Sequence, residues 1–159
     1  MVKKRVVGSE KTLTVIKPDG VGGRLIGEVV KRLERKGVEP VAMKMALMSS
    51  QRARLFYKNL KSEIPDSVFD SLIEYVTSDR IVVIVWQGNG VVSKVRRIIG
   101  PTDPKKAKKA HVRSLSKESL EKRFDRGEAV RNIIHASATV KEAKREIDFF
   151  FRPGEICKL

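Results

Sequence analysis

The longest unbroken run of apolar side chains in this chain, Ile81 to Trp86, is only six residues long. It is rich in β-branched residues and is followed by the turn sequence Gly88-Asn89-Gly90, a combination typical of a buried strand. A membrane-spanning helix would need roughly 20 such residues. The run therefore predicts one strand of a sheet and argues against a membrane anchor.

Other segments alternate between strand and helix patterns. β-branched or alternating apolar residues predict strands at residues 11–17, 38–48 and 132–136. Apolar residues at helical spacing predict helices at residues 25–33, 49–60, 65–76, 91–99, 117–123 and 140–150. This order predicts an α+β sandwich of the ferredoxin-like split β-α-β kind, with a four-stranded, mostly antiparallel sheet. We expect helices on one face of the sheet, a helical pair, and an enlarged basic loop.

Length and composition indicate one soluble domain. The chain has 159 residues, of which 41% are hydrophobic and 33% charged. We expect a basic tail at residues 1–9, with no apolar segment of a secretory signal behind it, and a single domain at residues 10–159. The single cysteine, Cys157, excludes an internal disulfide and suits a reducing, cytoplasmic location. One cysteine and two histidines do not make a zinc site of the usual type.

The formal net charge of +15 is the unusual property of the composition. More than half of this excess lies between Ser93 and Arg131, a segment with thirteen basic and five acidic residues. Such a surface predicts either a polyanionic partner or simply a solvated charged face. Only one aromatic residue, Phe124, occurs there, which argues against a platform that stacks nucleic-acid bases.

The segment from Arg131 to Thr139 is the strongest candidate for chemistry. His135 follows a short apolar pair and precedes two small residues, and Thr139-Val140-Lys141-Glu142 has the form of a capping box. His135 should therefore lie where a strand gives way to a helix, with its ring accessible. A neutral imidazole can act as a nucleophile, a base or a metal ligand. A structural role is the more common explanation for a single histidine.

Two basic residues could reach this histidine. Lys17 ends the first predicted strand, and the turn Pro18-Asp19-Gly20 fixes its position. Arg96 flanks the apolar stripe of the helix at residues 91–99, whereas Arg97 points further outward. Either residue could equally be structural, since such turns usually only connect elements and such arginines often lie along apolar surface.

Glu146 lies at the margin of the apolar face of the last predicted helix, eleven residues after His135. A carboxylate in this position could hold the imidazole in one orientation. The alternative is an ordinary surface pair with Lys141 or Arg145.

The motifs together resemble those of nucleoside diphosphate kinases, from about Glu10 to Ile156. The match to that family's Asn-Ile-Ile-His-Gly-Ser signature, at Arg131 to Ser137, is highly specific. The other similar segments, in the family's order, are Thr14-Val15-Ile16-Lys17-Pro18-Asp19-Gly20-Val21, Phe56-Tyr57-Lys58-Asn59-Leu60, Val85-Trp86-Gln87-Gly88, and Arg96-Arg97-Ile98-Ile99-Gly100-Pro101-Thr102-Asp103-Pro104.

The resemblance implies a ping-pong reaction in which a γ-phosphoryl group passes from a nucleoside triphosphate to His135 and then to a nucleoside diphosphate. Among catalytic residues it implies Glu146, which orients the ring, together with Lys17 and Tyr57; Ser137 supports the site. The nucleotide-binding residues that it implies are Lys17, Arg96, Thr102 and Arg113 for phosphates, Asn132 with Lys17 for the sugar 3′-hydroxyl, and Phe69 for stacking on the base.

The resemblance also implies Mg²⁺ carried by the nucleotide phosphates, no metal site in the protein, and a homo-oligomer, either hexamer or tetramer. The chain departs from the family after Arg113: Ser114-Leu115-Ser116 replaces the family's Gly-Asp-Phe, and the insertion at residues 114–130 is longer than the family's segment. The alternative function is a basic nucleic-acid-binding or interaction protein on the same fold with little catalysis.

Overall fold

The computed structural model describes residues 10–158. Its strands are β1 (Glu10–Ile16), β2 (Glu39–Ala46), β3 (Ile81–Gly88) and β4 (Ile134–Ala136). Its α-helices are α1 (Pro18–Gly22), α2 (Ile26–Glu34), α3 (Ser50–Phe56), α4 (Asp66–Thr77), α5 (Val91–Ile99), α6 (Leu120–Phe124) and α7 (Val140–Phe150). Short 3₁₀ turns are η1 (Lys58–Ser62), η2 (Pro104–Lys106), η3 (Val112–Leu115) and η4 (Pro153–Glu155).

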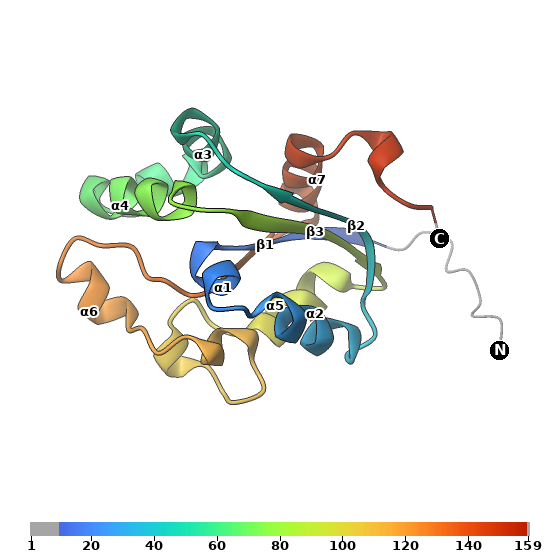
Figure 1. The fold of residues 1–159 in the computed structure, drawn as a ribbon, viewed down its shortest axis with the longest axis horizontal. Helices are drawn as coiled ribbons and strands as arrows, with labels where there is room; N and C mark the ends of the chain where they lie inside the picture. Colours follow the sequence, from blue (N-terminus) through green and yellow to red (C-terminus); the bar gives the residue numbers. More distant parts are fainter. Residues whose placement is uncertain (1–9, 159) are drawn as a thin grey trace.

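The four strands form one antiparallel sheet in the order β2-β3-β1-β4, which confirms the predicted fold class. Helices cover both faces of this sheet, whereas we expected them on one face. In Figure 1, α3, α4 and α7 lie on one side of the sheet, and α1, α2 and α5 lie on the other. The physical reason is that β3 is apolar at six successive positions and β1 carries apolar residues on both of its faces, Leu13 and Val15 on one and Ile16 on the other, so both faces must be covered.

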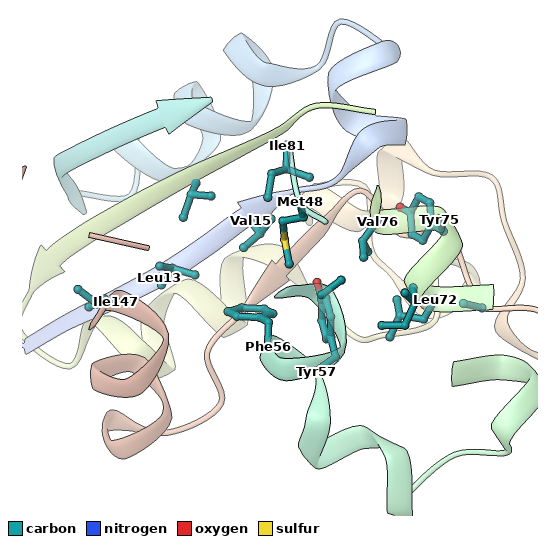
Figure 2. Packing of buried hydrophobic residues seen from close by; sticks show 14 of the residues in the cluster. Leu13, Val15, Met48, Phe56, Tyr57, Leu72, Tyr75, Val76, Ile81 and Ile147 are labelled. Atoms are coloured by element: carbon teal, nitrogen blue, oxygen red, sulfur yellow. The ribbon is translucent and has the colours of Figure 1, made fainter. Parts of the chain in front are cut away.

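Side chains that alternate along the strands belong to two separate apolar clusters, one on each face of the sheet. Leu13 and Val15 of β1 join one cluster with Phe56, Tyr57 and helices α4 and α7, part of which Figure 2 shows. Ile16 and Trp86 join the other cluster, beneath α2 and α5. The Trp86 indole N–H donates to the Thr14 hydroxyl at 2.9 Å, so its polar atom is satisfied inside the sheet.

Most predicted elements are present, and two boundaries near the histidine differ. Pro18-Asp19-Gly20, expected as a turn, begins the short helix α1, because proline suits the first helical position. The last strand starts at Ile134 and not at residue 132, because Ile133 adopts a left-handed conformation that ends the extended backbone. The basic tail predicted at residues 1–9 lies outside the described residues.

Among residues 10–158, no helix is long and apolar enough to cross a membrane.

Candidate active site

A cavity of about 850 Å³ lies where β1 and β4 end, between α3, α4, α5, α6 and α7. Eight of the predicted site residues line it: Lys17, Tyr57, Arg96, Thr102, Arg113, Asn132, His135 and Glu146. Residues far apart in the sequence thus converge on one cavity that combines cationic groups with a histidine.

His135 is the centre of the polar end. It lies in β4, next to β1, where Val15 is its partner across the ladder, and its side chain is 18% exposed. Its Nε2 lies 3.0 Å from both carboxylate oxygens of Glu146. Nδ1 has no hydrogen-bond partner among the described residues, which leaves its lone pair available when Nε2 carries the proton. The ring packs edge-on against Phe56 and Tyr57, with centroid distances of 5.3 and 5.7 Å.

Glu146 is held behind the ring. Only 1% of its side chain is exposed, and the Ser137 hydroxyl donates to its Oε2 at 2.6 Å. Burial alone would raise the pKa of Glu146, but the His135 ring, Ser137 and Arg145 together lower it below its usual value. The carboxylate is therefore charged at neutral pH, where it favours the Nε2–H tautomer and stabilises positive charge that develops on the ring.

The backbone before the histidine forms a tight γ-turn. Ile134 N–H donates to the carbonyl of Asn132 at 2.8 Å, and Ile133 at the centre has φ +72°. This conformation is strained for a β-branched residue and persists only where its surroundings enforce it. Asp19 supplies that support, because its Oδ2 accepts from Ile133 N–H at 3.0 Å while its Oδ1 accepts from the Tyr75 hydroxyl.

Lys17 and Asn132 form a buried polar chain beside the ring. The Lys17 ammonium donates to Asn132 Oδ1 at 2.9 Å, and Asn132 Nδ2 donates to the Thr102 carbonyl at 2.9 Å. Burial first, and then the nearby Arg113 charge, lower the pKa of Lys17 to about 7. Both side chains thus present groups suited to an anionic, hydroxylated ligand, with Thr102 at the rim.

Arg113 and Arg96 bring two further cations to the cavity. The buried Arg113 guanidinium donates to the carbonyls of Ile134, at 3.0 and 3.3 Å, and of Gly100, at 2.9 Å. Burial and then repulsion from Arg96 lower the pKa of Arg113 to about 10. Arg96 is exposed on α5 at the cavity edge, as its position beside the apolar stripe predicted. The arrangement can neutralise several phosphate charges.

Tyr57 completes the polar end. It follows α3 and is buried, and burial and then the Glu146 charge raise the pKa of its hydroxyl. The phenol therefore stays protonated at every working pH and serves as a hydrogen-bond donor.

Phe69 does not belong to the cavity. Like its neighbour Val68 it is 2% exposed and belongs to the apolar cluster that includes α4, but its ring is not among the side chains that line the cavity, so the structure lends no support to the predicted stacking of a base on it. Consecutive helix residues point about 100° apart. The preceding residue, Val68, lines the cavity together with Leu72, one turn further along α4.

Sequence reasoning missed several residues that shape the site. Asp19 was assigned only to a turn, although it supports both Ile133 and Lys17. Leu120 and Phe124 of α6 line the cavity from within the insertion. The helical signal near residue 120 was available for α6, but nothing in the sequence placed that helix beside α4.

The residues described here contain no group of three or more histidine, cysteine, aspartate or glutamate side chains that could hold a metal ion.

Comparison with known proteins gives a consistent result. The family model "Nucleoside diphosphate kinase" matches residues 10–156. A nucleoside diphosphate kinase of Metallosphaera sedula is 40% identical over 153 residues, which cover 94% of this chain and 99% of that protein. Nucleoside diphosphate kinase II, chloroplastic, of Arabidopsis thaliana is 38% identical over 150 residues, 94% of this chain but 59% of the relative's length.

Solved structures agree. A nucleoside-diphosphate kinase from Borrelia burgdorferi, described as a transition-state mimic with bound vanadate and ADP, superimposes with a TM-score of 0.90 at 34% identity, covering 95% of this chain and 92% of that one. An NDP kinase from Pyrobaculum aerophilum gives a TM-score of 0.85 at 30% identity, covering 94% and 100%.

Fold and sequence thus define a nucleotide-binding phosphotransferase. More particularly, the chain belongs to the nucleoside diphosphate kinase family, whose substrates are nucleoside tri- and diphosphates.

Proposed function

We propose that this kinase transfers the γ-phosphoryl group through a covalent phosphohistidine on Nδ1 of His135. The observation that carries the proposal is the pair of 3.0 Å contacts from Nε2 to Glu146, which leaves Nδ1 as the ring nitrogen without a protein partner among the described residues. A histidine held in this way is an oriented nucleophile.

The reaction has two half-steps that use the same cavity. The Nδ1 lone pair attacks the γ-phosphorus, the bond from that phosphorus to its bridging oxygen breaks, and the electron pair leaves on the nucleoside diphosphate. A β-phosphate oxygen of a second diphosphate then attacks the phosphohistidine, and the P–N electron pair returns to Nδ1. Glu146 stabilises the positive charge on the ring while the phosphoryl group is attached.

The other residues bind and position the phosphates. Arg113, fixed by three hydrogen bonds to backbone carbonyls, and Arg96 neutralise charge on the transferring and neighbouring phosphates. The Tyr57 hydroxyl donates near the phosphoryl group. Lys17 and Asn132 bind the sugar 3′-hydroxyl, and Thr102 lies beside the phosphates.

Mg²⁺ would enter this site coordinated by the nucleotide phosphates. The carboxylates nearest the phosphate end are already engaged: Asp19 accepts from Tyr75 and Ile133, and Glu146 contacts His135 and Ser137. Phosphate oxygens and water would therefore hold the ion, which suits its preferred octahedral shell. When bound, it would offset phosphate charge beside the two arginines.

The test is phosphoenzyme formation. We expect wild-type protein, mixed with Mg²⁺ and γ-labelled ATP, to gain one acid-labile phosphoryl group that added diphosphates remove. The His135→Ala variant should gain none. His111→Ala, which removes the other histidine of the chain, is the matched control and should label normally. Labelling of the His135→Ala protein would overturn the assignment of the nucleophile.

We also propose a homo-oligomer, hexamer or tetramer, with the edge strand β2 as a contact. This strand ends the sheet, and Met43 and Met45 on it are 49% and 53% exposed, an apolar surface that a second copy could cover. Sedimentation of the full chain tests its oligomeric state.

We further propose a single domain at residues 10–159, a basic tail at 1–9 and a cytoplasmic location, which the single cysteine suits.

A second candidate function is binding of nucleic acid. A separate cavity of about 420 Å³ between α2 and α5 supports it, since its lining is strongly basic. The basic residues around it are Arg32, Arg35, Lys36, Lys94 and Arg97, with His111 beside them. Of these, Arg32 is paired with Glu28, whereas Arg35 and Arg97 contact no carboxylate within 4 Å among the described residues.

A further inference from the structure

The active-site cavity has two chemically different parts. Around His135 it is lined by cationic and hydrogen-bonding groups. Away from this end, Leu60, Ile64, Val68 and Leu72 around α4 and Leu120 and Phe124 of α6 form an apolar part of the lining, with Asn59 and Glu63 beside it. Figure 1 shows α6 at the same end of the molecule as α4 and facing it. A nucleotide has the same division, with charged phosphates at one end and a flat base with apolar faces at the other.

Helix α6 belongs to the insertion, yet it is tied to the rest of the protein. Its first residue, Leu120, donates its N–H to Asp103 at 3.2 Å, and the Ser119 hydroxyl caps the helix by accepting from Lys122 N–H. After the helix, Ala129 N–H donates to the Ser71 hydroxyl of α4 at 3.1 Å. These contacts fix both ends of the segment that carries Phe124.

Arg123 fixes the helix from its other side. Its guanidinium donates to both carboxylate oxygens of Glu118, at 2.6 and 2.8 Å, and to Glu128 at 2.5 Å. The Arg123 side chain is 17% exposed. Because Phe124 follows Arg123 directly, a fixed guanidinium on one side of α6 presents the phenyl ring on another, toward the cavity that it lines.

We infer that α6 is the second wall of the nucleobase site and that the Phe124 ring contacts the base opposite Val68 and Leu72. The inference rests on the proposed function, since it assigns the base of the same nucleotide whose phosphates meet His135. Phe69, the aromatic residue expected for this role, does not line the cavity, whereas Phe124 does and supplies an aromatic surface there. A ring against a base contributes affinity that does not depend on the phosphates.

The first experiment compares two phosphoryl donors on Phe124→Ala. ATP carries the base, and ribose 5-triphosphate carries only sugar and phosphates. For the rate constant of His135 phosphorylation at low donor concentration, we expect a loss of about tenfold with ATP, since stacking on an aromatic ring is typically worth this order. We expect no change with ribose 5-triphosphate. With ATP we expect a kcat within about twofold of the wild-type value, because a contact made equally in the ground state and the transition state changes KM and not kcat.

The matched control is Ile26→Ala, which removes a partly buried apolar side chain of α2 outside the cavity and should change neither rate. Arg123→Gln tests the positioning role of the ion pairs. It should raise the KM for ATP, as Phe124→Ala should. The kcat and the rate constant of His135 phosphorylation by ribose 5-triphosphate should stay unchanged.

The second measurement uses Phe124→Trp. The single native tryptophan, Trp86, is fully buried in the sheet, so a change in emission relative to wild type reports the new indole. We expect ADP to change this emission at saturation and inorganic tripolyphosphate to leave it unchanged.

Equal losses with ATP and ribose 5-triphosphate in Phe124→Ala would overturn the inference, as would an unchanged ATP rate or equal responses of the tryptophan to both ligands. These outcomes leave the proposed function intact, because His135 would still be labelled. Failure of wild-type protein to label on His135 would instead contradict the proposed function itself.

Discussion

Lys17 carries its ammonium group into a buried position beside Arg113, and burial followed by this neighbouring charge lowers its pKa to about 7. Bound phosphate would favour the charged form and raise that pKa again. Nucleotide binding should therefore take up a proton above about pH 7.

We expect the affinity for a nucleoside diphosphate to fall as pH rises from about 7 to 10, because free Lys17 loses its charge over this range. Calorimetry in buffers of different ionisation enthalpy measures the proton uptake directly. In Lys17→Arg the charge persists, so the uptake should disappear. Uptake that is unchanged in this variant would assign the titrating group elsewhere.

The same shift has a consequence for stability. An unfolded lysine titrates near 10.4, so between about pH 7 and 10 the unfolded chain holds a proton that the folded chain lacks. The contribution of Lys17 to the free energy of unfolding therefore increases with pH across this window in the absence of nucleotide.

Single residues were predictable where a local pattern fixed their direction. Arg96 was placed beside an apolar stripe and lines the cavity, and Glu146 was placed on the inner margin of its helix and contacts His135. Phe69 lies one position after Val68, which lines the cavity, and one position in a helix rotates a side chain by about 100°. Val68 and Phe69 are both apolar, so composition alone does not distinguish the residue that faces the cavity from the one that faces the core.

At the scale of elements, Gly100 ends α5 and begins the segment that leads to Thr102. It has φ +85°, and a Cβ there would lie 2.6 Å from the His111 ring. Its carbonyl also accepts from Arg113. The end of the helix and the position of the Arg113 guanidinium thus depend on one residue without a side chain.

We expect Gly100→Ala to destabilise the protein by about 1–3 kcal/mol, because alanine is strained at positive φ and displaces His111. The KM for ATP should rise as Arg113 moves. Gly27→Ala is the matched control: a Cβ at Gly27, inside α2, meets nothing within 4 Å, and the change should stabilise by about 0.5–1 kcal/mol. Thermal denaturation and steady-state kinetics of both variants test this. Equal stability of the two would contradict the explanation.

Elements with explicit end signals were predicted best. Helix α5 runs from Val91 to Ile99 and α7 from Val140 to Phe150, as expected from Gly100 and from the Thr139 cap. Helix α1 was missed because its five residues contain a sequence that also forms turns. The γ-turn that shortens β4 depends on Asp19, more than a hundred residues away, so no local pattern could reveal it.

On the scale of the whole molecule, basic residues line two separate cavities. Arg96 and Arg113 face the active-site cavity, whereas the neighbouring Arg97 lines the cavity between α2 and α5. The sequence separated Arg96 from Arg97 around α5 but did not predict the second cavity, because that cavity depends on how α2 packs beside α5.

If the second cavity binds nucleic acid, affinity should fall steeply with salt as counterions are released. We expect Arg35→Gln combined with Arg97→Gln to reduce the slope of log K against log salt by about 2, without change in kinase activity. A filter-binding titration of single-stranded and duplex DNA measures this. Competition by ADP, or an unchanged slope, would place nucleic acid in the active-site cavity or on the general surface instead.

Lys17, Asn132 and Thr102 are joined by hydrogen bonds at the place where the sugar would bind, so these polar groups already have partners within the protein. An arriving ribose hydroxyl must take over a hydrogen bond that the protein makes with itself. The exchange conserves the number of hydrogen bonds. Binding of the sugar therefore depends on shape and contributes little to the binding enthalpy. The contacts among Lys17, Asn132 and Thr102 thus position both side chains for a sugar hydroxyl.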